Sequence, residues 1–346
     1  MESAMSSRHM LNVLLLSLCY FTLQDFDELS RVAQPRIHAT DRIRIAEAFR
    51  IAEQIGDSLW SGWSKTPFAL LLVTPTHEFL LRHPKPTQDW DKAGYDSLLR
   101  CDVYFRKRLL SMNLLATYPA VNGISTVVVG QPENTQAKTS THWIVTLLHE
   151  HFHQLQEGQA DYYDAVNALN LSRGDQTGMW MLNYPFPYDS VAIQQQFKRM
   201  TAALHTALRA AGTPALQEQA SEFLKERQRF TSLLSSDDHK YFSFQLWKEG
   251  IARYTEYHIA RLAGKYFTPS SAVSNLPDFI PFATRADTLY NQIISRLNNV
   301  DLGKSRRIVF YTVGAAEGLL LDTTNPGWRK EYQRKRFYLE KYYSTE

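Results

Sequence analysis

One stretch of the chain combines two histidines and a glutamate at a spacing that suits metal chemistry. The segment His149-Glu150-His151-Phe152-His153 contains the pattern H-E-x-x-H. On an α-helix, residues four positions apart lie on the same face, so the imidazoles of His149 and His153 can reach one cation. Glu150 lies beside that cation, where its carboxylate can hold a water molecule and take its proton. The pattern therefore predicts a zinc site with His149 and His153 as ligands and Glu150 as the general base.

The helix that carries this pattern is expected to be buried, because a rigid site needs a rigid support. Its apolar residues before the pattern are Trp143, Ile144, Val145, Leu147 and Leu148. Ser140 or Thr141 can cap the beginning of this helix with a side-chain oxygen. His151 is two positions from each ligand histidine and points away from their shared face. We therefore expect His151 to pack or to support the site rather than to bind the metal.

A zinc enzyme needs a third protein ligand and an open fourth position. Glu249, within the helical segment that runs from Phe244 toward Leu262, is the best candidate. Gly250 follows it directly, and Ala252 lies two residues further on, and both are small enough to let two helices approach closely. Glu256 lies seven residues after Glu249 on the same helical face, where it can orient a ligand histidine from behind. The sequence thus predicts His149, His153 and Glu249 as the metal ligands.

These two helices together resemble the gluzincin metallopeptidases, the group of thermolysin and the membrane alanyl aminopeptidases. The resemblance rests on H-E-x-x-H and on the later pattern Glu249-Gly250-x-Ala252-x-Tyr254-x-Glu256. It implies zinc bound by His149, His153 and Glu249, with Glu150 as the general base. The intervening segment 154–248 is longer than in the well-known members of that group. An inserted helical hairpin would account for the excess.

Asp161 is an alternative third ligand. The metzincin metallopeptidases extend H-E-x-x-H with x-x-G-x-x-H/D. This chain has Gly158 and Asp161, each two residues further along than that pattern requires, and Met179 and Met181 follow. Under this alternative, Asp161 binds the metal and the role of Glu249 is incidental.

Peptide hydrolysis places negative charge on the carbonyl oxygen, and a phenol donor beside the metal would stabilise it. The chain has 18 tyrosines, so most of them have structural roles. Three lie on segments that could face the site, namely Tyr254, Tyr257 and Tyr311. Among them we favour Tyr311 as the donor.

The remaining chain predicts an α+β fold that brings the two site helices together. Short apolar runs bounded by turn residues indicate strands, and longer runs with helical periodicity indicate helices. The expected strands are 68–73, 78–82, 102–106 and 125–130. The expected helices are 40–55, 190–211, 214–234, 244–262, 285–297, 304–321 and 328–342. The segments 83–95 and 162–188 are expected to be loops.

From these elements we expect a zincin-like catalytic domain with a small mixed sheet, two site helices and a mostly helical C-terminal part. An N-terminal α+β part, residues 25–188, carries the H-E-x-x-H helix. The helical hairpin occupies residues 189–236, and residues 237–346 carry the third ligand. The strand at 125–130 is either a sheet edge that borders the cleft, where an extended substrate can pair, or an ordinary interior strand.

Composition and charge narrow the choice of partners. The 346 residues are 44% hydrophobic and 21% charged, which is typical of a globular protein. The net charge is +3 and no run of Lys or Arg indicates a nucleic acid partner. Arg8 and His9 precede an apolar run at 11–23, which predicts a signal peptide over residues 1–24 and export to the periplasm or medium, with no membrane span after its removal. Cys101 is then the last remaining cysteine, which excludes a disulfide framework.

The sequence therefore predicts an exported zinc metallopeptidase that acts on a peptide or protein substrate. Two alternatives stay open. The chain could be an exported binding protein on a degenerate zincin scaffold, or a zinc hydrolase of a non-peptide amide. Neither the oligomeric state nor the cleavage specificity follows from the sequence.

Overall fold

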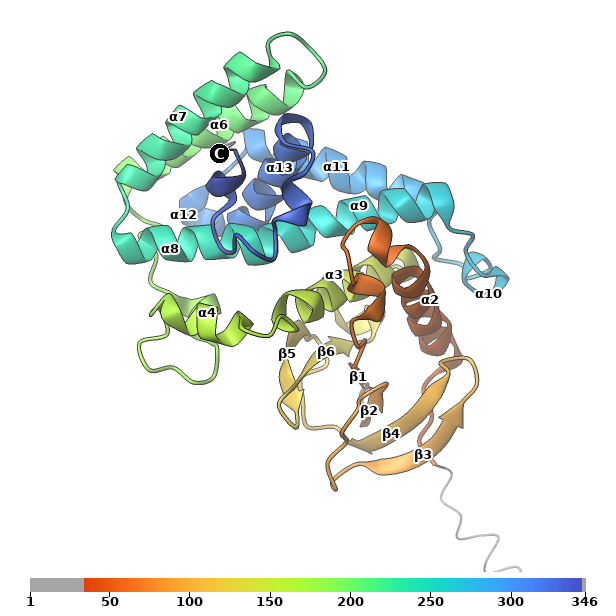
Figure 1. Ribbon diagram of the computed structural model, residues 1–346. Helices are drawn as coiled ribbons and strands as arrows, with labels where there is room; N and C mark the ends of the chain where they lie inside the picture. Colours follow the sequence, from red (N-terminus) through yellow and green to blue (C-terminus); the bar gives the residue numbers. More distant parts are fainter. Residues whose placement is uncertain (1–33, 344–346) are drawn as a thin grey trace, which may run out of the picture. The chain divides into compact units, whose positions relative to one another are not determined.

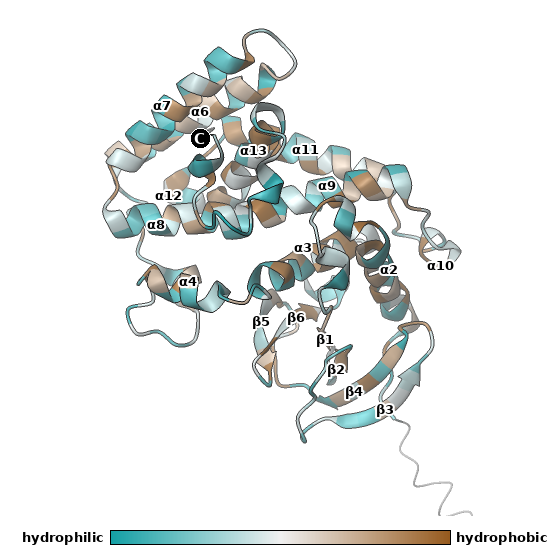
Figure 2. Cartoon of the chain, viewed as in Figure 1, coloured by the Kyte–Doolittle hydropathy of each residue, from teal (hydrophilic) through white to brown (hydrophobic). Residues whose placement is uncertain are grey.

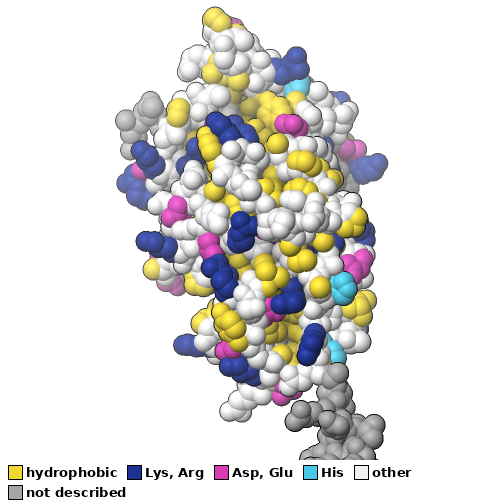
Figure 3. Space-filling view, turned by 90° about the vertical axis from the view of Figure 1, so that its right-hand side faces the viewer, with side chains coloured by type: hydrophobic (Ala, Val, Ile, Leu, Met, Phe, Trp, Pro, Cys, Tyr) yellow, Lys and Arg dark blue, Asp and Glu magenta, His cyan; other side chains and the backbone are white. Residues whose placement is uncertain are grey.

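The structure is a computed structural model that describes residues 34–343 (Figure 1). The expected signal peptide lies outside the described residues. In the part that is described, none of the helices combines the length and the apolar character needed to cross a bilayer. On the face shown in Figure 3, basic side chains are interspersed with acidic and apolar ones.

Apolar runs form the centre of a mixed, six-stranded sheet. Its order is β3 (Asp91–Asp96), β4 (Cys101–Lys107), β2 (His77–Leu81), β1 (Leu70–Val73), β6 (Ile124–Gly130) and β5 (Leu115–Val121). Strands β1 and β6 run parallel, and the other neighbouring pairs are antiparallel. Side chains alternate between the two faces of a strand. Both faces of β1 are buried, as its continuous apolar sequence requires.

The two faces of the sheet are covered differently. On one face, Leu71, Leu80 and Val128 form an apolar cluster with Trp90 and Val121. The opposite face carries the helices α2 (Ala39–Ile55) and α3 (Ser140–Glu157), which also pack against each other (Figure 1). The H-E-x-x-H helix therefore lies directly on the sheet, with β5 and β6 beneath it.

Several expectations about the strands are confirmed and others need correction. The strands expected at 68–73, 78–82, 102–106 and 125–130 are present as β1, β2, β4 and β6. Strand β6 is an interior strand, because it lies between β1 and β5. The edge strand beside α3 is β5, which the sequence did not reveal because it contains Pro119 and lacks a clear alternation. The expected loop 83–95 ends early, since β3 begins at Asp91.

The second half of the chain is helical. Its longer helices are α6 (Val191–Arg209), α7 (Leu216–Ser232), α8 (Ser236–Gln245), α9 (Ile251–Tyr266), α11 (Phe282–Asn298) and α13 (Ile308–Thr324). Helices α6 and α7 pack side by side, which confirms the expected hairpin. Figure 2 shows hydrophobic and hydrophilic residues alternating along both, as amphipathic helices require.

Three expectations about this half are wrong. The expected loop 162–188 contains the short helices α4 (Tyr162–Ala168) and α5 (Trp180–Asn183). The helix expected at 304–321 is divided into α12 (Leu302–Ser305) and α13, with Arg306 between them at a φ of 46°. The segment 328–342 forms 3₁₀ turns at Trp328–Lys330 and Leu339–Tyr342 instead of a helix. Four of its aromatic side chains, Trp328, Tyr332, Phe337 and Tyr342, are buried in the core, and this packing outweighs local helical periodicity.

Candidate metal centre

Three potential ligand atoms converge where α3 meets the beginning of α9. Nε2 of His149 lies 3.2 Å from Nε2 of His153. Oε2 of Glu249 lies 3.8 Å from the first nitrogen and 3.4 Å from the second. Around a tetrahedral zinc ion with bonds of about 2.0–2.1 Å, neighbouring ligand atoms are about 3.3 Å apart. The three atoms lie within 4.8 Å of one another, so this donor set fits zinc.

Each histidine has an oxygen acceptor close to its other ring nitrogen. Nδ1 of His149 lies 2.7 Å from Oε1 of Glu256, and Nδ1 of His153 lies 2.6 Å from Oε1 of Gln156. The amide nitrogen of Gln156 faces the backbone carbonyls of Trp247 and Lys248, which leaves its oxygen for His153. An acceptor at Nδ1 favours the tautomer whose lone pair is on Nε2. In the neutral imidazoles, both lone pairs are thus directed to the place where a metal would bind.

The charges around the site favour a cation. Burial alone would lower the pKa of His149, but contacts with Glu249 and Glu256 raise it to about 10. Burial would raise the pKa of Glu249, yet the imidazoles of His153 and His149 hold it well below its usual range. Burial would also raise the pKa of Glu256, but Arg253 and His149 lower this pKa to about 2. Two ionised carboxylates therefore face the histidines.

Glu249 is placed by a local irregularity of its helix. A π-helical segment, Leu246–Gly250, joins α8 to α9, and π-helical turns of this kind are frequent at functional sites. A Cβ on Gly250 would lie 2.5 Å from Cα of Gly314 on α13, so the two backbones are in contact. A close approach of two helices at Gly250 is present, but the partner helix is α13 and not the H-E-x-x-H helix α3.

The same crossing positions Tyr311. This residue lies one turn before Gly314, and its ring is nearly parallel to that of His149, with centroids 6.4 Å apart. Burial and the negative charge of Glu249 raise the pKa of Tyr311. The guanidinium of Arg307 donates to the phenol oxygen at 3.0 Å. Tyr311 thus lies beside the candidate ligands, where a hydrogen-bond donor to the substrate was expected from the sequence.

The other two tyrosines considered are engaged elsewhere. The hydroxyl of Tyr254 donates to the carboxylate of Asp322 at 2.8 Å. The ring of Tyr257 packs against those of His258 and Tyr290.

Glu150 is held by a residue that sequence reasoning missed. The hydroxyl of Thr117, on edge strand β5, donates to Oε2 of Glu150 at 2.8 Å. Only 5% of Glu150 is exposed, so this contact fixes a buried carboxylate next to the histidines. Gln156 was also missed, although its position three residues after His153 on the same helix could have identified it. No local pattern links Thr117 to α3.

Asp161 does not reach the histidines. Its side chain is 70% exposed, and a guanidinium nitrogen of Arg336 lies 2.7 Å from its carboxylate. Glu256 faces Nδ1 of His149 and not Nε2, which gives it the supporting position expected for it. Among the described residues, the ligand group is His149, His153 and Glu249.

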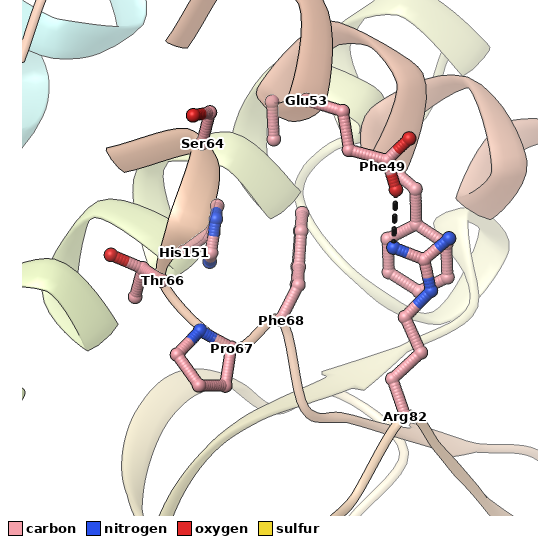
Figure 4. A pocket seen from close by; sticks show the side chains of 9 residues that line it. Phe49, Glu53, Ser64, Thr66, Pro67, Phe68, Arg82 and His151 are labelled. Atoms are coloured by element: carbon pink, nitrogen blue, oxygen red, sulfur yellow. Dashed lines mark hydrogen bonds and ion pairs between the residues drawn. The ribbon is translucent and has the colours of Figure 1, made fainter. Parts of the chain in front are cut away.

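His151 points away from this group, as expected. Its ring stacks on Phe68 with centroids 3.8 Å apart, and its Nδ1 is hydrogen-bonded to Gln154. It borders a separate cavity of about 240 Å³ (Figure 4). The ion pair between Glu53 and Arg82 lies on the far side of that cavity.

The cap of α3 also differs from expectation, since Thr139 accepts from the amide of His142.

Comparison of the chain with protein families, with curated proteins and with solved structures finds no match in any of the three.

Proposed function

We propose that the protein is a zinc-dependent peptidase with a zincin-like catalytic domain. The observation that carries this proposal is the convergence of the ligand atoms of His149, His153 and Glu249, with Glu150 next to them. These three residues would hold the ion, and a bound zinc ion supplies the Lewis acidity that polarises a scissile carbonyl and acidifies water.

The residues around the ion have separate tasks. Glu150 takes the proton of the attacking water at its carboxylate and passes it to the leaving nitrogen. Thr117 keeps that carboxylate in place through the contact at Oε2. Tyr311 donates a hydrogen bond to the carbonyl oxygen as negative charge develops there. The burial of His149 and His153 strengthens these interactions, because little water competes with them.

The edge position of β5 supports a peptide as the substrate. One side of β5 pairs with β6, and no strand pairs with its other side among the described residues. An extended peptide can add to such an edge through backbone hydrogen bonds. Because Thr117 on this strand contacts Glu150, a peptide paired there would run past the general base.

The substitution Glu150→Gln tests this function directly. The amide cannot take the proton, so the hydrolysis of a mixed peptide library should fall by orders of magnitude, while zinc content stays near one ion per chain. Asp161→Asn is the matched control, because it also removes a carboxylate without touching the site. Zinc content near zero after zinc loading of the folded protein would refute the proposal, and so would equal rates in the wild type and Glu150→Gln.

A further inference from the structure

Arg285, on α11, is a buried arginine without a partner. Only 9% of it is exposed, and its Nε has no hydrogen-bond partner in the described part of the chain. It takes part in none of the ion pairs found among residues 34–343. Burying a guanidinium costs free energy unless an anion compensates for the lost water. Such a group marks a place where an anion can bind.

The surroundings of Arg285 connect it to the candidate metal centre. Glu256 and Arg253 are both close enough to shift the pKa of Arg285. Burial and the charge of Arg253 lower this pKa, and the charge of Glu256 opposes them. Glu256 does not neutralise Arg285, because it already contacts Arg253 at 2.6 Å and His149 at 2.7 Å. His142, two helical turns before His149 on α3, senses the same charges, since burial, Arg285 and Arg253 lower its pKa to about 4.

A third guanidinium lies on the same wall of the site. The ring of Tyr311 has Arg253 at 6.0 Å and Arg307 at 5.6 Å from its centroid. In the described structure, Arg307 has the phenol of Tyr311 as its hydrogen-bond partner and forms no ion pair with a carboxylate. We name these three residues the arginine wall: Arg253 on α9, Arg285 on α11 and Arg307 at the N-terminal cap of α13. Its three positive charges exceed the two negative charges of Glu249 and Glu256, the carboxylates that act on these arginines.

The surface next to Arg253 has the same character. A shallow depression there is lined by Arg253, Leu289, Gln292, Ile293, Arg296 and Thr312. Two of these residues are basic and none is acidic. A guanidinium binds a carboxylate through two parallel hydrogen bonds, and this geometry makes arginine the usual partner of that group.

We propose that the arginine wall binds a carboxylate of the substrate, so that the preferred peptides carry a carboxylate close to the scissile bond. This inference rests on the proposed peptidase function and specifies its substrate class. The carboxylate can belong to an acidic side chain or to the C-terminus of the peptide. Both sources present the same planar, bidentate acceptor to the guanidinium groups.

Calorimetric binding of three peptides to the full chain separates the two sources. The first is acetyl-Ala-Glu-Ala amide, with an acidic side chain and a blocked end. The second is acetyl-Ala-Gln-Ala with a free C-terminus, and the third is its neutral amide. We expect one or both of the acidic peptides to bind about tenfold or more tightly than the neutral one, before and after zinc loading. Equal binding of all three would overturn the proposal.

Substitution of Arg285 assigns the effect to the arginine wall. Arg285→Gln should abolish the preference for the acidic peptide, and Arg285→Lys should keep part of it. Arg261→Gln, which removes a positive charge from α9 next to Tyr257, is the control and should keep all of it. If Arg285→Gln does not fold, Arg307→Gln replaces it in the same comparison. A preference that survives in the folded variant refutes the role of the wall.

The two proposals fail separately. If the acidic peptides bind through Arg285 but the zinc-loaded protein cleaves no peptide, the carboxylate site stands and the peptidase function falls. If the protein cleaves neutral and acidic peptides equally and Arg285→Gln changes nothing, the peptidase function stands and the arginine wall falls.

Discussion

The contact between Glu256 and His149 should control the affinity of the site for zinc. Oε1 of Glu256 lies 2.7 Å from Nδ1 of His149, and both residues are buried. In Glu256→Gln the side chain keeps its shape but loses its charge. Loss of such a supporting contact typically weakens metal binding about tenfold to a hundredfold. This range corresponds to about 1.4 to 2.7 kcal/mol of binding free energy.

The size of the loss should depend on pH. Glu256 raises the pKa of His149, and so it favours the proton that competes with the metal for Nε2. In Glu256→Gln that competition is weaker, which offsets part of the loss at low pH. We therefore expect a larger loss of affinity at pH 9 than at pH 6. Titration of the zinc-loaded protein with a chelator of known affinity at the two pH values measures both numbers.

A matched control lies on the same helix. His258 on α9 contacts Asp322 at 3.0 Å, and this histidine is not in the ligand group. Asp322→Asn should therefore leave the zinc affinity unchanged while removing an equivalent histidine–carboxylate contact. The reasoning is refuted if Glu256→Gln binds zinc as tightly as the wild type at both pH values, or if Asp322→Asn shows the same loss.

Three further predictions concern protons and packing. Because the pKa of His149 is about 10, zinc binding at pH 7 should release about one proton. Calorimetry in buffers of different ionisation enthalpy counts the released protons. If none is released, His149 does not carry the charge assigned to it. A Cβ on Gly314 would lie 2.7 Å from Cα of Gly250. Gly314→Ala should therefore lower the free energy of unfolding, measured by urea titration, by about 1–3 kcal/mol, and it should also weaken zinc binding. If the free energy of unfolding and the zinc affinity are both unchanged, the two helices do not cross tightly. Burial raises the pKa of Glu317 to about 7, above the 4.5 of an ordinary glutamate, although Arg227 opposes the shift. The folded state therefore holds this proton more tightly, and its contribution to stability is complete below pH 4.5 and is lost as the pH rises to 7. Urea unfolding at pH 5 and 7.5 should show that Glu317→Gln lacks this part of the decline, and an identical decline in both proteins would contradict it.

The candidate ligands of the proposed metal could be selected from the sequence because their geometry is local. The four-residue spacing of His149 and His153 defines one helical face before any fold is known. Glu249 and Glu256 could be paired with them because both lie on one face of a second helix. The small residue Gly250 indicated a close helix crossing, although only the structure identifies Gly314 as its partner.

The features that escaped prediction depend on contacts between distant segments. Thr117 acts on Glu150 because β5 lies beneath α3, and nothing within 115–121 indicates that position. The charge of Arg253 acts on Arg285 because α9 packs against α11. The segment 328–342 has apolar residues at helical spacing, but it forms 3₁₀ turns in which Trp328 and Tyr342 are buried by tertiary packing. Periodicity is a property of one segment, whereas the places of these side chains depend on the contact between two segments.

The ligands of the proposed metal come from two structurally different halves of the chain. His149 and His153 belong to a helix supported by the sheet, whereas Glu249 belongs to the helical assembly that follows. An ion bound by all three would cross-link these halves and close a loop formed by residues 154–248. Closing so long a loop restricts the unfolded chain most. A metal at this point would thus also cross-link the two halves, so the stability of the folded protein would increase with the concentration of zinc.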